Sequence, residues 1–141
     1  MTTHDYASLV KTVYTAFNDR DFDRAAAVVT NDFEFRMIPT GQDFHGPDGI
    51  RQYLAVWADG FPESAATITD VIAGDQKAVV EFTGRGVHSG TLKTPMGDIA
   101  PTGNRVELEF CDVWEIVDDK LRRGRTYFDL ASLMRQLGMS D

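Results

Sequence analysis

The stretch Arg105–Asp129 reads RVELEFCDVWEIVDDKLRRGRTYFD, two alternating apolar runs joined by a pair of aspartates. From Val106 to Ile116 every second residue is apolar except Asp112, and the residues between them are mostly charged. A period of two is typical of a β-strand with one buried face. The stretch therefore predicts a β-hairpin in which Asp112 is the one charged residue on the buried face.

A buried carboxylate either finds a partner or has its pKa raised, and a raised pKa suits a general acid or base near neutral pH. If Asp118 and Asp119 are the two loop residues of the hairpin, Asp112 lies opposite Arg125. A one-residue bulge would place Thr126 there instead. A buried Asp112–Arg125 ion pair that only stabilises the sheet is the structural alternative to a catalytic carboxylate.

Length and composition limit the classes of protein to consider. The 141 residues, 43% of them hydrophobic, predict a single domain over residues 1–141 that buries a core without disulfide or metal support. Cys111 is the single cysteine, and no cluster has the spacing of metal ligands, so we expect neither metal nor cofactor. A net charge of −8 argues against nucleic-acid binding as the function.

The N-terminal residues lack the positive start and apolar core of a signal peptide, and no apolar run is long enough to span a bilayer. We expect a soluble cytoplasmic protein that makes no membrane contact.

Helix-forming segments precede strand-forming segments along the chain, which predicts an α+β fold. Apolar residues at three- and four-residue spacing predict a helix capped by Asp5 and ending near Asp19, a second over Asp21–Thr30, and a third that follows the turn at His45–Gly49 and ends before Pro62. A short last helix, Leu130–Leu137, is expected to pack across the sheet or against a second subunit. The segment from Thr91 to Asn104 is expected to be a long functional loop. The predicted strands are Phe33–Ile38, Ala65–Ala73, Lys77–Gly90, Arg105–Val117 and Leu121–Phe128.

Four short motifs, taken with this order of elements, resemble the SnoaL-like polyketide cyclases over nearly the whole chain. The motifs are FHGPDGI at Phe44–Ile50, GVHSG at Gly86–Gly90, PTGNRV at Pro101–Val106 and YFD at Tyr127–Asp129. The resemblance implies the fold of nuclear transport factor 2, a curved antiparallel sheet with three N-terminal helices around a conical pocket. It also implies a homodimer formed through the outer sheet face, where five residues project: Glu107, Glu109, Cys111, Val113 and Glu115.

Thr126 stands where the resemblance places the acid/base aspartate of these cyclases and of limonene epoxide hydrolase. A threonine hydroxyl cannot accept a proton at neutral pH, so neither the aldol cyclase nor the epoxide hydrolase mechanism carries over intact. The histidine that the cyclases place on the preceding strand corresponds to Asp112. Asp112 is therefore the candidate base.

Further candidates fall into two groups. His88, Arg125 and Thr126 could polarise a substrate oxygen, although a histidine such as His88 is more often satisfied by a loop carbonyl. Aromatic residues at helical or strand spacing could line the pocket or simply fill the core. The predicted substrate-binding residues are Tyr14, Tyr53, Trp57, Phe110, Trp114 and Thr126, and the predicted catalytic residues are Asp112, His88 and Arg125.

These residues favour a cofactor-independent acid–base enzyme, a cyclase, isomerase or hydrolase, that acts on a mostly apolar small molecule such as a polyketide or terpenoid intermediate. A charged substrate is less expected in so apolar a pocket. The alternative is a non-catalytic module that binds a small molecule in the same pocket, which the loss of the aspartate at position 126 would favour.

Overall fold

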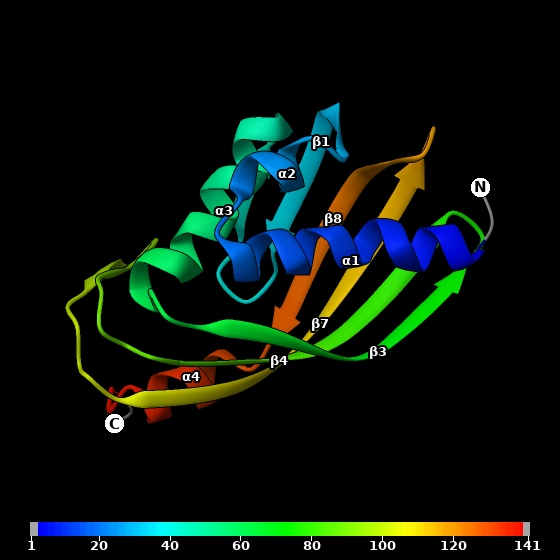
Figure 1. Cartoon of the computed structure of the whole chain (residues 1–141). Helices are drawn as coiled ribbons and strands as arrows, with labels where there is room; N and C mark the ends of the chain where they lie inside the picture. The colour runs from blue at the N-terminus through cyan, green and yellow to red at the C-terminus, as the bar shows by residue number, and fades with distance from the viewer. Residues whose placement is uncertain (1–2, 140–141) are drawn as a thin grey trace.

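A computed structural model describes residues 3–139, which fold into a strongly curved sheet with helices on both faces (Figure 1). The helices are α1 (Thr3–Asp19), α2 (Phe22–Ala26), α3 (Gly46–Gly60) and α4 (Leu130–Gln136). The strands are β1 (Val29–Met37), β2 (Gln42–His45), β3 (Ala65–Gly74), β4 (Lys77–Val87), β5 (Leu92–Thr94), β6 (Gly97–Ile99), β7 (Arg105–Val117) and β8 (Lys120–Phe128). The α+β class expected from the sequence is confirmed.

The main sheet has the strand order β2-β1-β8-β7-β4-β3, and β5 and β6 form a separate small hairpin. All neighbours in the main sheet are antiparallel except β1 and β8, which are parallel, so the sheet is mixed and not antiparallel throughout as expected. The alternation of apolar residues along a strand does not depend on the direction of its neighbour. The parallel pair was therefore invisible in the sequence pattern.

The predicted strands all form, with ends shifted by a few residues, and β7 has the predicted bounds. The second predicted helix is wrong in its last part, because β1 begins at Val29 and pairs with Leu121. The β-branched residues Val29 and Thr30 at its start favour that strand. Strand β2 and the β5–β6 hairpin were not predicted, and Asp5 lies inside the first turn of α1, not at its cap.

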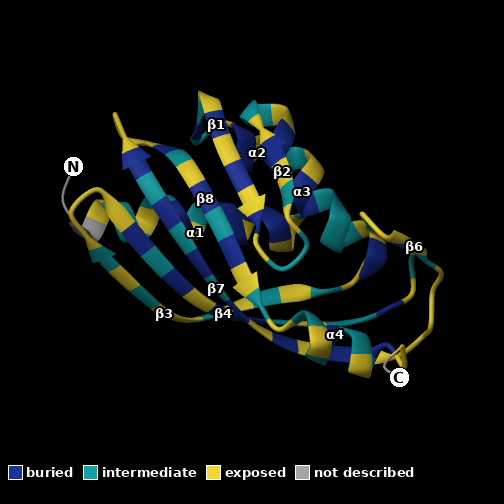
Figure 2. Cartoon of the chain, turned by 180° about the vertical axis from the view of Figure 1, so that it is seen from behind, coloured by how far each residue is buried: buried dark blue, intermediate teal, exposed yellow. Residues whose placement is uncertain are grey.

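The helices α1 and α3 cover the concave face of the sheet, and α4 lies on the opposite face (Figures 1 and 2). α4 packs on the end of β7 that extends beyond β8. There the side-chain amide of Gln136 accepts from Glu107 N at 2.8 Å and donates to Glu107 O at 2.9 Å. The amide group thus takes the place of a neighbouring strand, and the predicted packing of the last helix across the sheet is confirmed.

The β7–β8 hairpin decides what Asp112 faces. Asp118 and Asp119 both have left-handed backbone conformations, with φ of 51° and 63°, as a two-residue loop joining twisted strands requires. The register then shifts by one residue at Arg122, so Asp112 faces Thr126. Of the two registers that the sequence left open, the one with the bulge is correct. The even-numbered residues from Val106 to Ile116 are all buried, as predicted, and Figure 2 shows the alternation along the strand.

Gly124 makes room for the aromatic part of the core. It lies opposite Trp114 on the neighbouring strand, and a Cβ atom there would come within 2.6 Å of the Trp114 ring and 2.7 Å of the Phe35 ring. Phe35 and Trp114 pack on each other with ring centroids 5.5 Å apart, and Phe33 stacks on Trp114 at 6.3 Å. These rings can therefore lie directly on the backbone of β8 only because position 124 has no side chain.

We expect Gly124→Ala to lower the free energy of unfolding by about 1–3 kcal/mol, because overpacking a filled core displaces its side chains. Urea unfolding measures this change. The matched control is Gly74→Ala at the end of β3, where a Cβ would meet no atom within 4 Å, and the change there should be within about 0.5 kcal/mol. Equal stability of the two variants would contradict the packing argument.

Candidate active site

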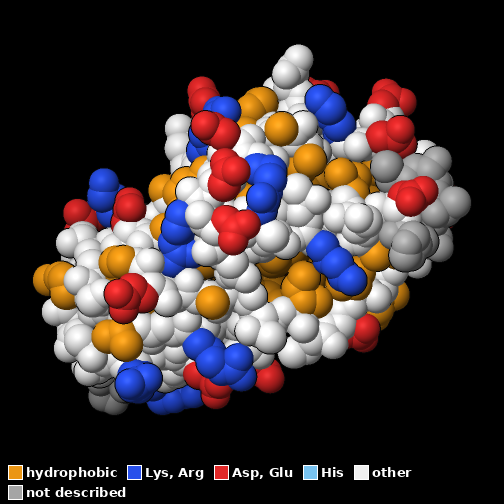
Figure 3. Space-filling model, in the orientation of Figure 1, with side chains coloured by type: hydrophobic (Ala, Val, Ile, Leu, Met, Phe, Trp, Pro, Cys, Tyr) orange, Lys and Arg blue, Asp and Glu red, His pale blue; other side chains and the backbone are white. Residues whose placement is uncertain are grey.

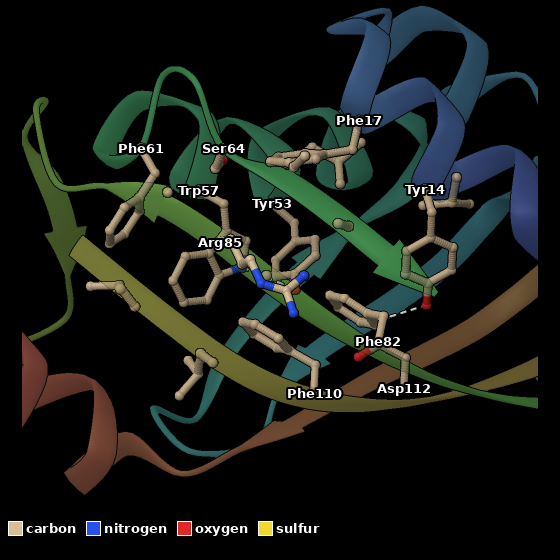
Figure 4. Close-up of a pocket in the computed structure, with 18 of the residues that line it drawn as sticks. Tyr14, Phe17, Tyr53, Trp57, Phe61, Ser64, Phe82, Arg85, Phe110 and Asp112 are labelled. Carbon is tan, nitrogen blue, oxygen red and sulfur yellow. Dashed lines mark hydrogen bonds between the residues drawn. The ribbon is translucent and has the colours of Figure 1, made fainter. Parts of the chain in front are cut away.

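A cleft lies between α1, α3 and the concave face of the sheet, and its walls are mostly aromatic (Figure 4). The space between the walls, including the open mouth, is about 670 Å³. A ligand that enters the cleft would lie against the faces and edges of these rings. The aromatic residues that line it are Tyr14, Phe17, Tyr53, Trp57, Phe61, Phe82, Phe110 and Trp114.

Asp112 lies at the inner end of this cleft and is 2% exposed. Its Oδ2 accepts a hydrogen bond of 2.7 Å from the hydroxyl of Tyr14 on α1, drawn as a dashed line in Figure 4. The Tyr14 hydroxyl in turn accepts from the indole Nε1 of Trp114 at 2.9 Å. The Tyr14 hydroxyl therefore donates its proton to the carboxylate, and this hydrogen bond fixes the orientation of Asp112.

The second oxygen of Asp112, Oδ1, is buried and has no hydrogen-bond partner among residues 3–139. Burial raises the pKa of Asp112 from 3.8 to about 7, although the hydroxyls of Thr126 and Tyr14 act in the opposite direction. Near neutral pH the carboxyl group is therefore divided between its acid and base forms, as a general acid–base catalyst requires. The sequence predicted that Asp112 is buried and left open whether it finds a partner or has a raised pKa; in the structure it has both.

Tyr53 on α3 supplies a second polar group to the cleft. Its hydroxyl accepts from Trp57 Nε1 at 3.1 Å, and no hydrogen bond that its own proton donates is found in the part of the chain described here. Burial, and then the charge of Asp112, raise the pKa of Tyr53, and the Trp57 indole and Thr126 hydroxyl offset this only in part, so the Tyr53 hydroxyl stays protonated. Tyr53 can therefore donate a hydrogen bond to an oxygen of a bound molecule.

Three of the predicted polar residues, Arg125, Thr126 and His88, do not line the cleft. Arg125 is opposite Val113 on the outer face of the sheet, where it forms an ion pair with Glu115 at 3.2 Å. The buried Asp112–Arg125 pair is therefore wrong, because the bulge at Arg122 turns Arg125 away from the cleft. Thr126 does face Asp112 and is fully buried, but it is not among the lining residues.

His88 is fully buried behind the cleft and does not line it. Its ring lies 5.3 Å from that of Phe61, and its Nδ1 accepts from the backbone N–H of Thr102 at 3.2 Å. Burial lowers the pKa of His88, an effect partly offset by the Ile99 carbonyl. The structure thus places His88 as an organiser of the 99–104 loop, the more ordinary of the two interpretations that the sequence left open.

Six predicted residues come together at the cleft: Tyr14, Tyr53, Trp57, Phe110, Asp112 and Trp114. Phe82 also lines it and was not predicted; Arg85 borders the cleft as well, but its side chain pairs with Glu107 on the outer face of the sheet. The glycines on either side of Arg85, Gly84 and Gly86, were a signal of close approach at this point. At Gly86, however, the close neighbour is the backbone and Cβ of Ser64, 2.7 Å from where a Cβ would lie.

Among the described residues, no group of three or more His, Cys, Asp or Glu side chains has a geometry that could hold a metal ion. A search of the same residues finds no helix with the length and hydropathy needed to cross a bilayer.

Comparison with known proteins supports the resemblance seen in the motifs. A sequence profile described as SnoaL-like polyketide cyclase matches residues 7–137. A comparison with curated protein sequences finds no match.

Similar solved structures include TsrD from Streptomyces laurentii, with a TM-score of 0.84 and 22% identity over 99% of both chains. IdmH from Streptomyces antibioticus has a TM-score of 0.75 and 22% identity, over 94% of this chain and 97% of its own. A protein with a ketosteroid isomerase-like fold from Catenulispora acidiphila, solved with trimethylamine, has a TM-score of 0.77 and 14% identity, over 94% and 93%. At these identities the likeness shows the fold, which is the predicted one.

The raised pKa of Asp112 predicts how stability depends on pH. Between about pH 4 and 7 the folded protein holds a proton on Asp112 that the unfolded chain has lost, so stability falls as pH rises through this window. The side-chain amide of an Asp112→Asn variant does not titrate. From pH 5 to pH 8 we therefore expect the variant to gain stability relative to the wild type, by a few kcal/mol at most.

Urea unfolding of both proteins at the two pH values measures the difference. Asp75→Asn, in the exposed turn between β3 and β4, is the control and should leave the difference independent of pH. A difference for Asp112→Asn that is the same at both pH values would show that Asp112 does not titrate in this window.

Proposed function

Because the chain belongs to the SnoaL-like polyketide cyclase family, we propose that it is a cofactor-independent acid–base enzyme for a mostly apolar small molecule. The reaction class is that of a cyclase, isomerase or hydrolase, and the substrate is of the polyketide or terpenoid type. One observation carries the proposal. The carboxyl group of Asp112, with a pKa of about 7 and a free Oδ1, lies at the inner end of an aromatic cleft.

In the proposed reaction Asp112 removes a proton from a carbon atom next to a substrate carbonyl group. The C–H bonding electrons form the enolate, and the proton moves to Oδ1. The Tyr53 hydroxyl donates a hydrogen bond to the carbonyl oxygen and stabilises the charge that develops there. The same proton then returns to another atom of the substrate or of the product, so the enzyme ends in its starting state.

Tyr14 acts through Asp112 in this scheme. Its hydrogen bond to Oδ2 leaves only Oδ1 free for the proton, and it lowers the pKa of a carboxyl group that burial alone would raise further. Tyr14 is therefore a positioning residue. Tyr53 takes the oxygen-polarising role that the sequence suggested for His88, Arg125 or Thr126.

Exchange of carbon-bound hydrogen tests this step whatever the final product is. A panel of polycyclic β-keto esters and ketones is incubated with the protein in D₂O, and mass spectrometry follows deuterium uptake next to the carbonyl. We expect Asp112→Asn to slow exchange of a responsive compound by about 10²-fold or more, the usual contribution of a positioned general base. Tyr53→Phe should slow it by a similar factor.

Asp75→Asn, remote from the cleft, should leave exchange unchanged. Exchange that continues at the wild-type rate in Asp112→Asn would exclude Asp112 as the base.

The alternative function is a non-catalytic module that holds a small molecule in the same cleft. Thr126, which cannot replace an acid/base aspartate, is the observation in its favour. A hydrophobic fluorescent probe should bind to the cleft in either case and quench the emission of Trp57 and Trp114, both of which line it. The binding module would be favoured if the probe binds saturably with the same affinity in Asp112→Asn and if no compound of the panel exchanges hydrogen.

We also propose a cytoplasmic location and a homodimer formed through the outer face of the sheet. That face carries the half-buried Cys111 and Val113, and Tyr127 beside them is 41% exposed. These side chains lie among charged ones, which suits a modest interface. Sedimentation at micromolar concentration should give a dimer, and Val113→Asp should give a monomer because it buries a charge in the interface. A wild-type monomer at that concentration would contradict the proposal.

A further inference from the structure

We propose that the hydroxyl of Thr126 links Asp112 to Tyr53 and couples the proton on the carboxyl group to the donor that faces the substrate. Thr126 is a positioning residue in this scheme, because it does not line the cleft and acts through its two neighbours. The link itself can be measured without a substrate, but its use in catalysis rests on the proposed function. The proposal gives a role to the position at which an acid/base aspartate was expected.

Thr126 faces Asp112 across the β7–β8 ladder, on the buried face of both strands. Side chains that lie directly opposite each other in an antiparallel pair have Cβ atoms about 4.5–5.5 Å apart. Thr126 Oγ1 and Asp112 Oδ1 are both buried and without a hydrogen-bond partner among residues 3–139. A small rotation of either side chain would therefore join a free donor to a free acceptor.

Tyr53 approaches the same hydroxyl from α3. Its ring packs on that of Phe35 with centroids 4.2 Å apart, and Phe35 is the neighbour of Gly124 in the β1–β8 ladder, two residues before Thr126 on the same face of β8. Burial raises the pKa of both Asp112 and Tyr53, and the hydroxyl of Thr126 lowers both, as a hydroxyl close to each group does. The base and the donor thus share one hydroxyl group.

A threonine at this position has a cost that a valine would not have. Valine has the same shape and suits a strand as well, whereas a buried hydroxyl without a partner lowers stability. Other threonine hydroxyls of this protein form structural hydrogen bonds: Thr69 donates to the Glu81 carbonyl at 3.1 Å, and Thr94 donates to the Gly97 carbonyl at 2.7 Å. The hydroxyl of Thr126 has no such bond and requires another explanation.

The hydroxyl group of Thr126 has one proton, so it donates to Asp112 or to Tyr53 but not to both at once. While Asp112 is ionised, its carboxylate is the stronger acceptor, and the Tyr53 hydroxyl donates to Oγ1. When Asp112 takes a proton from the substrate, the carboxyl group becomes a weaker acceptor, and the Thr126 hydroxyl can turn to the phenolic oxygen of Tyr53. The Tyr53 proton is then directed to the enolate oxygen as charge develops there, which stabilises the transition state more than the ground state.

Carbon-13 NMR of protein labelled at the aspartate carboxyl carbons follows the titration of Asp112 without a substrate. Acidic side chains, red in Figure 3, are spread over the surface, so the Asp112 signal is assigned by its absence from the Asp112→Asn spectrum. Thr126→Val keeps the shape and removes the hydroxyl. We expect it to raise the pKa of Asp112 by about 0.5–1, the effect of losing one hydrogen bond to the charged form. Thr126→Ser keeps the hydroxyl, and its Asp112 should titrate close to that of the wild type.

Tyr53→Phe distinguishes a link from two independent contacts. If Tyr53 donates to Thr126, its removal weakens the donor to Asp112 and raises the pKa of Asp112, but only in a protein with a hydroxyl at position 126. In Thr126→Val we therefore expect Tyr53→Phe to leave that pKa unchanged. The matched control is Thr30→Val in β1. The hydroxyl of Thr30 is also buried, but it lowers the pKa of Asp32, so the control should leave the pKa of Asp112 unchanged.

Three results would overturn the link: an unchanged pKa of Asp112 in Thr126→Val, an equal rise in Thr30→Val, or an effect of Tyr53→Phe that is the same with threonine and with valine at position 126. Each of these results leaves Asp112 as the proposed base.

The hydrogen-exchange assay tests the use of the link in catalysis. At pH 9 we expect Thr126→Val to slow exchange about tenfold when Tyr53 is present and about twofold or less in Tyr53→Phe. An equal factor in the two backgrounds would overturn the coupling. Coupled pKa effects without exchange of any compound would leave the link standing and overturn the proposed function.

Discussion

The burial of one carboxyl group is the constraint around which the site is organised. Asp112 is buried on the concave face of the sheet between Val80 and Thr126 of the neighbouring strands, where an unpaired carboxylate is costly. The fold limits that cost with the hydroxyl of Thr126 on the neighbouring strand and with a hydrogen bond from the hydroxyl of Tyr14, which lies 98 residues earlier in the chain on the first helix. The cost that remains appears as a pKa near 7 in place of 3.8. The same burial that lowers stability above neutral pH thus gives the group its acid–base capacity.

The aromatic packing around Asp112 sets the shape of the cleft. Trp114 contributes both to the core and to the site. Its ring packs on Phe33, Phe35 and the backbone at Gly124, and its indole N–H donates a hydrogen bond to the hydroxyl of Tyr14. Phe82 and Phe110 stack in parallel with centroids 4.7 Å apart and form another wall. A rigid core therefore extends directly into the site, and a substitution such as Gly124→Ala that shifts Trp114 would also disturb the carboxyl group.

The site combines hydrogen-bond donors that are already committed with one that is free. The proton of Tyr14 and the indole N–H groups of both tryptophans have acceptors within the protein, whereas the Tyr53 proton has none among the described residues. The Tyr53 proton and the free Oδ1 of Asp112 are the groups that a ligand would satisfy. The proposed enzyme follows from this division.

The sequence by itself determined the fold class, the buried face of β7 and the isolation of Asp112 on it, because the alternation of apolar residues along a strand is a local property that burial imposes directly. It also found the aromatic walls, which recur at helical and strand spacing. Only the tertiary structure decided that Asp112 faces Thr126 and is held by Tyr14, because a one-residue bulge at Arg122 changes the register without changing the alternation on β7. The exclusion of His88 and Arg125 from the cleft had the same origin, because which side chains meet across a curved sheet depends on contacts between residues that are distant in the chain.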